Sequence, residues 1–238
     1  MNLPKEKFKK IALGTVQFGL KYGIANKIGR TNYDQVCQIL DFAYKNKINS
    51  LDTANSYGVS EMVLGKYFNT RPKHSWEVTT KIKSSSDSSL NQVSDSSMRL
   101  GHYPYAVLAH SKADYLNPIF YENLNKLKED KIVKKIGVSV YNHQDITEIL
   151  SFNKPDIIQL PLNILDTRLY LDGTIDDLVS KKITLQIRSV FLQGLYFMSI
   201  KQLPQKLLPL KKYLFDIESI CDEFNLSIGE LALNFVNE

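Results

Sequence analysis

The sequence has little of what marks a secreted or membrane-bound protein. Only 2 of its 238 residues are cysteine, and Cys37 and Cys221 lie far apart within helical patterns, which predicts buried or half-buried reduced thiols. No apolar run is long enough to cross a membrane. The basic stretch at residues 5–10 is followed by a short apolar segment interrupted by glycine, unlike a signal peptide. We therefore expect a cytoplasmic protein with no membrane partner.

An excess of one charge and the common phosphate-binding loops are also lacking. The 30 basic and 25 acidic residues are interspersed and leave a formal net charge of +5. The densest basic run, residues 131–135, lies between an expected helix and an expected strand, which favours a solvated helix end over a nucleic-acid site. Neither a G-x-G-x-x-G nor a G-x-x-x-x-G-K-[ST] loop occurs. Nucleic acid is not an expected partner.

What the sequence does contain is a regular alternation of short apolar segments and amphipathic helical segments. Strands are expected at residues 11–15, 48–52, 76–81, 105–110, 135–139, 156–160 and 183–187. Between them, helices are expected, among others, at 61–68, 117–128, 143–150 and 175–179, with an exposed serine-rich loop at 84–89. In the helix at 61–68, Met62, Leu64 and Phe68 are the expected packing residues. Such alternation is typical of parallel βα units.

Polar residues mark the carboxyl ends of six of the expected strands: Asp52, Lys81, His110, Ser139, Gln159 and Arg188. In a βα barrel these ends converge on one face, where catalytic groups are found, whereas an open doubly wound sheet spreads them along an edge. The pattern therefore predicts one α/β domain over residues 1–238, a TIM-type (β/α)8 barrel that is incomplete, with about seven βα units.

The stretch from Asp52 to Glu61 contains two groups that suggest chemistry. Asp52, at the end of the second expected strand, supplies a carboxylate, and Tyr57, on the following turn, supplies a phenol. A phenol with a pKa near ~10 is a poor acid at neutral pH unless a nearby cation stabilises the phenolate. Lys81, at the end of the next strand, is the candidate cation.

These residues resemble the signature of the aldo-keto reductases. The resemblance is carried by Asp52-Thr53-Ala54-x-x-Tyr57-Gly58-x-Ser60-Glu61, Leu13-Gly14-Thr15-x-x-Phe18-Gly19, Thr80-Lys81 and Leu108-Ala109-His110, in the family's order. It implies a (β/α)8 barrel that uses NADPH, with NADH as an alternative, and reduces a small-molecule carbonyl without a Rossmann domain. It implies no metal.

The resemblance also implies roles for the catalytic residues. Tyr57 would protonate the carbonyl oxygen while hydride moves to the carbonyl carbon, and Lys81 would favour the phenolate. Asp52 would hold Lys81 charged and oriented, and His110 would donate a hydrogen bond to the carbonyl oxygen.

Cofactor contacts carry over to a second set of positions: Gly14, Thr15, Asp52, Ser139, Gln159 and Arg188. Val140 replaces an asparagine that often follows the serine, and Arg188 stands where many members have a tyrosine. The string Arg188-Ser189-x-Phe191-Leu192-Gln193-Gly194 resembles a subgroup associated with bacterial surface-polysaccharide biosynthesis. A guanidinium can stack on a ring or clamp a carboxylate or phosphate, so a sugar or nucleotide-sugar substrate is one option.

Residues 231–238 resemble the helix that precedes the eighth strand of the family, so the eighth βα unit is expected to be missing. An unclosed barrel exposes strand edges that favour self-association. Two other functions stay open. A barrel with a degenerate cofactor site could act as a binding or regulatory subunit, and Lys81 could form a Schiff base in an aldolase.

Overall fold

The computed structural model describes residues 11–85 and 88–237, so the basic stretch at 5–10 and part of the expected serine-rich loop lie outside the described residues. The chain divides into two compact units. Unit 1 holds the chain up to Tyr22 together with Ile28–Gln159, and unit 2 holds Gly23–Lys27 and Leu160–Glu238. We describe each unit by itself.

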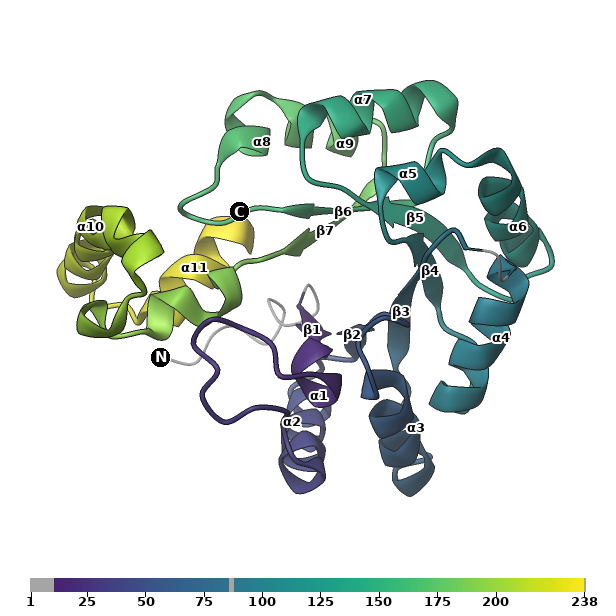
Figure 1. The fold of residues 1–238 in the computed structure, drawn as a ribbon, viewed down its shortest axis with the longest axis horizontal. Helices are drawn as coiled ribbons and strands as arrows, with labels where there is room; N and C mark the ends of the chain where they lie inside the picture. Colours follow the sequence, from purple (N-terminus) through teal and green to yellow (C-terminus); the bar gives the residue numbers. More distant parts are fainter. Residues whose placement is uncertain (1–10, 86–87, 238) are drawn as a thin grey trace. The chain divides into compact units, whose positions relative to one another are not determined.

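Unit 1 is built on parallel strands that follow one another in chain order (Figure 1). They are β1 (Ala12–Gly14), β2 (Ser50–Asp52), β3 (Glu77–Ile82), β4 (Ala106–Ala109), β5 (Lys135–Ser139) and the first part of β6 (Ile157–Pro161). Each strand pairs in parallel with the next, from β1 to β6. The near-continuous burial of β3, β4 and β5 is typical of parallel strands covered on both sides.

The register of the strands aligns several of the predicted site residues. Gly14 pairs with Asp52 across β1 and β2, and Ser139 pairs with Gln159 across β5 and β6. Gly14, Asp52 and Ser139 are the last residues of β1, β2 and β5, so these positions lie at the carboxyl ends of their strands. The seventh strand, β7 (Thr184–Arg188), belongs to unit 2.

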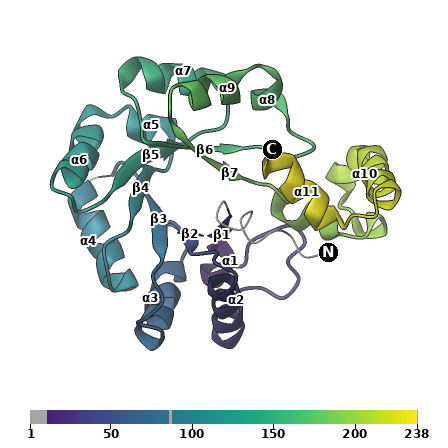
Figure 2. The same ribbon diagram turned by 180° about the vertical axis from the view of Figure 1, so that it is seen from behind.

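Helices follow the strands of unit 1, and α2, α3, α4 and α6 lie along one side of them (Figure 2). The helices are α1 (Val16–Gly19), α2 (Tyr33–Lys45), α3 (Ser60–Thr70), α4 (Ser89–Leu100), α5 (Lys112–Tyr115), α6 (Pro118–Glu129) and α7 (His143–Phe152). Side chains cap most of their first turns. Asn32, Ser88, Ser111, Asn117 and Asn142 each accept a hydrogen bond from the backbone three residues on.

The main core of unit 1 lies between β1–β3 and helices α2–α4. It contains, among others, Leu51 and Val78 of the strands and Leu40, Leu64 and Tyr67 of the helices. Leu64 and Phe68 pack here as expected, but Met62 is 49% exposed. The expectation for Met62 is wrong because it stands two residues before Leu64, almost on the opposite face of the helix.

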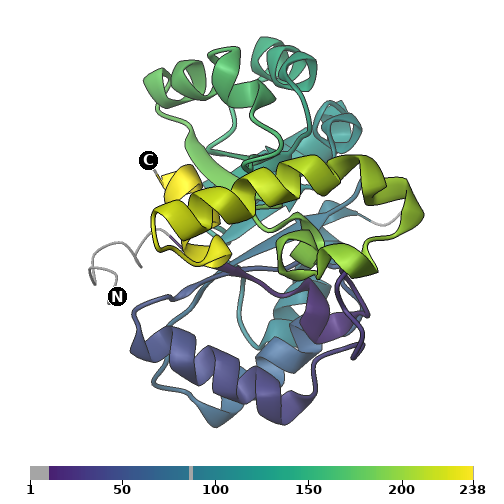
Figure 3. The same ribbon diagram turned by 90° about the vertical axis from the view of Figure 1, so that its left-hand side faces the viewer.

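In its described residues, unit 2 contains the end of β6, β7, four α-helices and three short 3-10 helices; α10 and α11 are prominent in Figure 3. The helices are α8 (Arg168–Leu171), α9 (Thr174–Ser180), η2 (Leu192–Phe197), η3 (Ile200–Gln202), η4 (Gln205–Leu210), α10 (Lys211–Glu223) and α11 (Ile228–Asn237). Its core gathers Leu195, Tyr196, Leu214, Ile217 and Ala232.

The α/β fold class and the strand–helix alternation of a TIM-type barrel are confirmed, with seven strands in the described residues. The helices α1, α5 and α8 are additional, and four residues are too few to show a helical period. Among the described residues no helix is both long and apolar enough to span a bilayer. A single domain, a missing eighth unit and self-association stay predictions.

Candidate active site

The ammonium group of Lys81 is the most completely bound charge at the strand ends. Its nitrogen lies 2.7 and 2.9 Å from the two carboxylate oxygens of Asp52 and 2.8 Å from the backbone oxygen of Thr53. The Lys81 side chain is only 2% exposed. Each ammonium proton therefore has an oxygen acceptor, and the charged group is held in one position at the end of β3.

The turn that carries Tyr57 is fixed by backbone hydrogen bonds and by two glycines. The backbone amide of Tyr57 donates to the backbone oxygen of Ala54 (2.9 Å), and the backbone oxygen of Tyr57 accepts from the Ser60 amide (3.1 Å). Gly58 has a φ of +58°, a conformation that glycine adopts readily. A Cβ on Gly19 would stand 1.8 Å from the backbone oxygen of Tyr57. Only glycine at position 19 therefore lets the end of α1 approach this turn.

Lys81 and Tyr57 are in contact. The Lys81 nitrogen lies 4.9 Å from the centre of the Tyr57 ring, within the range of a cation–π interaction. The Tyr57 side chain is half-buried. The structure thus brings the predicted carboxylate, ammonium and phenol together.

His110 follows β4, and its backbone amide donates to the Ile82 oxygen at the end of β3 (2.9 Å). Its Nδ1 lies 3.4 Å from the Ser56 hydroxyl oxygen, which belongs to the same turn as Tyr57. Burial, and then the positive charges of Lys81 and Lys83, lower the pKa of His110 below 6.5. The imidazole is therefore mainly neutral at pH 7 and can donate one hydrogen bond.

Ser139 and Gln159 form a chain that ends on Asp52. The Ser139 hydroxyl donates to the Gln159 side-chain oxygen (3.1 Å), and the Gln159 amide nitrogen donates to the Asp52 carboxylate (2.9 Å). Both residues are buried. Donation by Gln159 gives the carboxylate a further partner besides Lys81.

Gly14 and Thr15 differ in their surroundings. Gly14 is exposed, and a Cβ placed on it would meet no atom within 4 Å. Thr15 is fully buried, and its hydroxyl donates to the Asp52 backbone oxygen (3.0 Å) and accepts from Ser60 (2.9 Å). Thr15 thus fixes the backbone at Asp52, while Gly14 leaves open space beside it.

Arg188 lies in unit 2, at the end of β7, and its guanidinium approaches the Ser189 hydroxyl (3.4 Å). Asn163 also belongs to unit 2, where its side-chain oxygen accepts from the buried Tyr196 hydroxyl (3.2 Å). The structure therefore brings together the predicted site residues of unit 1, and the part of Arg188 in the site stays a prediction.

A buried acidic residue links the turn of Tyr57 to the strand of Lys81. Glu61, 1% exposed, accepts from the Thr80 hydroxyl (2.6 Å) with one oxygen and from the Arg99 Nε (2.8 Å) with the other. Thr80 directly precedes Lys81, and Glu61 opens α3 just after the turn. This contact ties the start of α3, next to the turn of Tyr57, to β3.

Sequence reasoning did not single out Ser56, Lys83, or the pairing of Gln159 with Asp52. Ser56 lies inside the Tyr57 motif and Lys83 lies two residues past Lys81, so position alone could have suggested them. The contact between Gln159 and Asp52 joins residues 107 positions apart and depends on the fold.

The chain is similar to known proteins in sequence and in fold. A sequence profile described as the aldo/keto reductase family matches residues 10–238. The glycerol dehydrogenase from Gluconobacter oxydans is 21% identical, over 96% of this chain and 79% of that chain, with a TM-score of 0.75. An aldo/keto reductase from Klebsiella pneumoniae, solved in complex with NADP and acetate, is 16% identical over 96% of this chain and 77% of that chain (TM-score 0.72).

An aldo-keto reductase from Bacillus halodurans in its holo form is 22% identical over 82% of this chain and 66% of that chain, with a TM-score of 0.65. At these identities the likeness establishes the fold. No curated protein matches the chain.

Proposed function

The chain belongs to the aldo/keto reductase family, and we propose that it is an NAD(P)H-dependent oxidoreductase that reduces the carbonyl group of a small molecule. The observation that carries the proposal is the position of the Lys81 ammonium, between the Asp52 carboxylate and the face of the Tyr57 ring. This arrangement suits a general acid that must give up a proton at neutral pH.

Tyr57 is the proposed acid. When its hydroxyl gives a proton to the carbonyl oxygen, negative charge develops on the phenol, and the cation 4.9 Å from the ring centre stabilises that charge. Asp52 keeps the cation oriented through both carboxylate oxygens. A well-placed general acid accelerates a reaction by about 100- to 10,000-fold.

His110 is the proposed hydrogen-bond donor to the substrate. Its lowered pKa keeps the imidazole neutral near pH 7. If the Ser56 hydroxyl donates to Nδ1, the ring proton is on Nε2 and can be donated to the carbonyl oxygen. Such a bond strengthens as negative charge grows on that oxygen in the transition state.

The residues around Asp52 fit a nicotinamide cofactor. The proposed cofactor is NADPH, with NADH as the alternative, and it supplies the hydride when bound. Ser139 and Gln159 offer a hydroxyl and a carboxamide, which complement the donors and acceptors of a nicotinamide amide. Gly14 leaves the space next to the Asp52 backbone unfilled. The solved relative from Klebsiella pneumoniae is in complex with NADP and acetate.

The other functions are less well supported. A Schiff-base lysine attacks through a free nitrogen lone pair, whereas each proton of the Lys81 ammonium has an oxygen acceptor in place. Family membership does not favour a binding or regulatory subunit. We keep a sugar-derived carbonyl as the finer substrate proposal, on the string that begins at Arg188, and a reducing cytoplasm as the location, because both cysteines are free thiols.

The proposal is tested by following hydride transfer directly. The protein is incubated with 4-nitrobenzaldehyde and NADPH deuterated at the transferred position, and the alcohol is analysed by mass spectrometry. We expect one deuterium in the alcohol. Tyr213→Phe, which removes an exposed tyrosine hydroxyl on α10, is the matched control for Tyr57→Phe and is expected to behave like the wild type. Absence of labelled alcohol with the wild type contradicts the proposal.

A further inference from the structure

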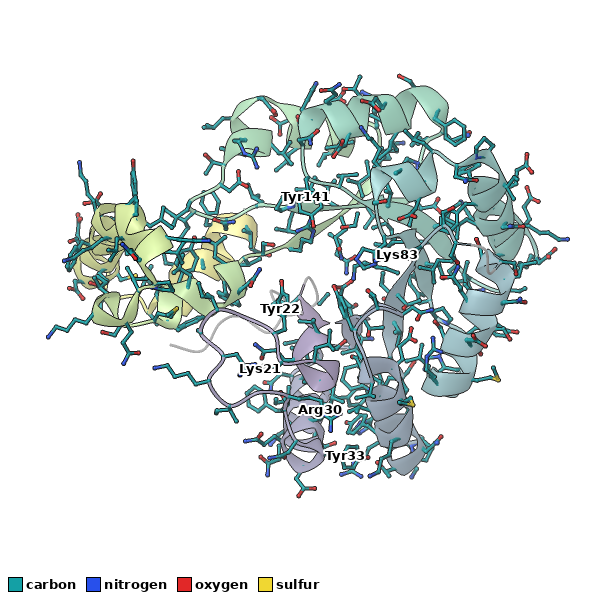
Figure 4. All side chains as sticks on the ribbon, in the orientation of Figure 1. Lys21, Tyr22, Arg30, Tyr33, Lys83 and Tyr141 are labelled. Atoms are coloured by element: carbon teal, nitrogen blue, oxygen red, sulfur yellow. The ribbon has the colours of Figure 1, made fainter. Side chains whose placement is uncertain are left out.

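Lys83 continues the catalytic side of β3 beyond its end. It stands two residues after Lys81, and alternate residues of an extended segment point to the same face. Figure 4 shows Lys83 at the end of β3, on the side of the strands turned away from α3 and α4. Its side chain is exposed. A cation therefore stands beyond the Lys81 ammonium on the same face.

The backbone that carries Lys83 is fixed from both sides. The Gln92 side chain of α4, which is 8% exposed, donates to the Lys83 oxygen (2.8 Å) and accepts from the Lys83 amide (3.4 Å). The next amide, of Ser84, donates to the Asp114 carboxylate (2.7 Å). The lysine is thus an exposed side chain on a held backbone.

The charge of Lys83 acts on His110 and has no carboxylate partner in the part of the chain that the structure describes. Lys83 is among the cations that lower the pKa of His110. The ion pairs found there join other residues. The nearby Asp114 carboxylate is used otherwise, since its oxygens accept from the Ser84 amide and from the Ser111 hydroxyl (2.6 Å).

We propose that Lys83 binds an anionic group, carboxylate or phosphate, on the carbonyl compound reduced at this site. The inference rests on the proposed function, because it assigns the substrate class of the same site. His110 and Tyr57 face the carbonyl oxygen, and Lys83 lies near His110 on the same strand face as Lys81. A substrate whose carbonyl meets His110 therefore carries its negative charge within reach of the Lys83 ammonium, a point charge that suits either anion.

The test compares pairs of aldehydes that differ in charge. They are 4-carboxybenzaldehyde against 4-nitrobenzaldehyde, and D-glyceraldehyde 3-phosphate against D-glyceraldehyde, each with NADPH at low ionic strength. Lys83→Gln removes the charge at similar length, and Lys83→Arg keeps it. Lys45→Gln, on the exposed end of α2, removes an unrelated lysine charge.

We expect Lys83→Gln to lower kcat/KM for the anionic member of at least one pair by about threefold to tenfold, the range of a partly exposed charge-assisted bond. The neutral member should change little, and Lys83→Arg should retain the preference. Added salt should reduce the ratio of kcat/KM for the anionic aldehyde to kcat/KM for the neutral aldehyde in the wild type. The aldehyde pair whose ratio changes in Lys83→Gln shows whether the site binds a carboxylate or a phosphate. An unchanged ratio in Lys83→Gln for both pairs, with neutral aldehydes still reduced, overturns the inference.

A binding measurement separates this inference from the proposed function. The ring signals of His110 are followed by NMR in histidine-labelled protein during titration with terephthalate and, separately, inorganic phosphate. We expect a saturable shift with at least one anion, weakened about threefold or more in Lys83→Gln and unchanged in Lys45→Gln. If no aldehyde is reduced but this shift occurs, only the proposed reaction fails. If Lys83→Gln titrates like the wild type with both anions, the anion site is wrong.

Discussion

Lys81 and Asp52 form a buried ion pair in which one ammonium nitrogen lies within 2.9 Å of both carboxylate oxygens. The Lys81 side chain is 2% exposed and the Asp52 side chain 16%. They come from the neighbouring strands β2 and β3, so the sheet itself sets their separation. We propose that the pair positions the cation beside Tyr57, and we expect it also to contribute to the stability of the fold.

Asp52→Asn should destabilise the protein strongly. The substitution leaves the Lys81 cation buried beside neutral oxygens, and removing one partner of a buried pair costs about 3 to 5 kcal/mol. Urea unfolding measures the loss. Asp52→Asn combined with Lys81→Met should recover most of it, because no unpaired charge remains. Equal stability of Asp52→Asn and the wild type would contradict a buried, tightly coupled pair.

His110 should make the protein less stable in acid. Its folded-state pKa lies below 6.5, so between that pKa and about pH 6.5 the unfolded chain binds a proton that the folded protein does not. The favourable contribution is fully present above about pH 6.5 and is lost as the pH falls through the folded pKa. NMR titration of the ring should give a pKa below 6.5, and His110→Gln should reduce the loss of stability in this window.

The NMR titration of His110 can also be carried out in Lys83→Gln. Removing that positive charge makes protonation of His110 easier, so its pKa should move upward. A pKa of His110 at or above 6.5 in the wild type would contradict the burial and the charges described around it.

Gly19→Ala should disturb the turn of Tyr57. The new methyl group would stand 1.8 Å from the Tyr57 oxygen and 2.5 Å from the Ser60 nitrogen, both backbone atoms that cannot move aside alone. We expect a loss of about 1 to 3 kcal/mol in unfolding free energy, as for an overpacked core, together with a fall in kcat. Gly14→Ala, with nothing within 4 Å of the added carbon, is the control for stability.

Thr80→Val should loosen the link between α3 and β3. It keeps the side-chain shape but removes the donor to the buried Glu61 carboxylate, a charge-assisted bond whose loss costs about 1.5 to 3 kcal/mol. Thr80→Ser retains the hydroxyl and should keep most of the stability and kcat. If valine and serine at this position behave alike in urea unfolding, the bond to Glu61 is not a significant support.

Much of the candidate site follows from the sequence, because its residues stand where parallel strands end. Asp52, Lys81 and His110 each close or follow a short apolar segment, and parallel strands bring such ends to one edge. Apolar periodicity likewise located Leu64 and Phe68 in the core. Local pattern sufficed for these positions.

Other features depend on distances that no local pattern contains. The amide of Gln159 on β6 reaches Asp52 on β2 although the two residues stand 107 positions apart, and Ser56 meets His110 across 54 positions. These features needed the three-dimensional structure.

The central claim is that Tyr57 is the acid of a carbonyl reduction. The most direct measurement is reduction of 4-nitrobenzaldehyde by NADPH with the wild type and Tyr57→Phe, alongside NADPH binding by fluorescence titration. The account predicts similar NADPH affinity for both proteins and a fall in kcat of about 100-fold or more for the variant. Turnover by Tyr57→Phe at the wild-type rate would contradict it.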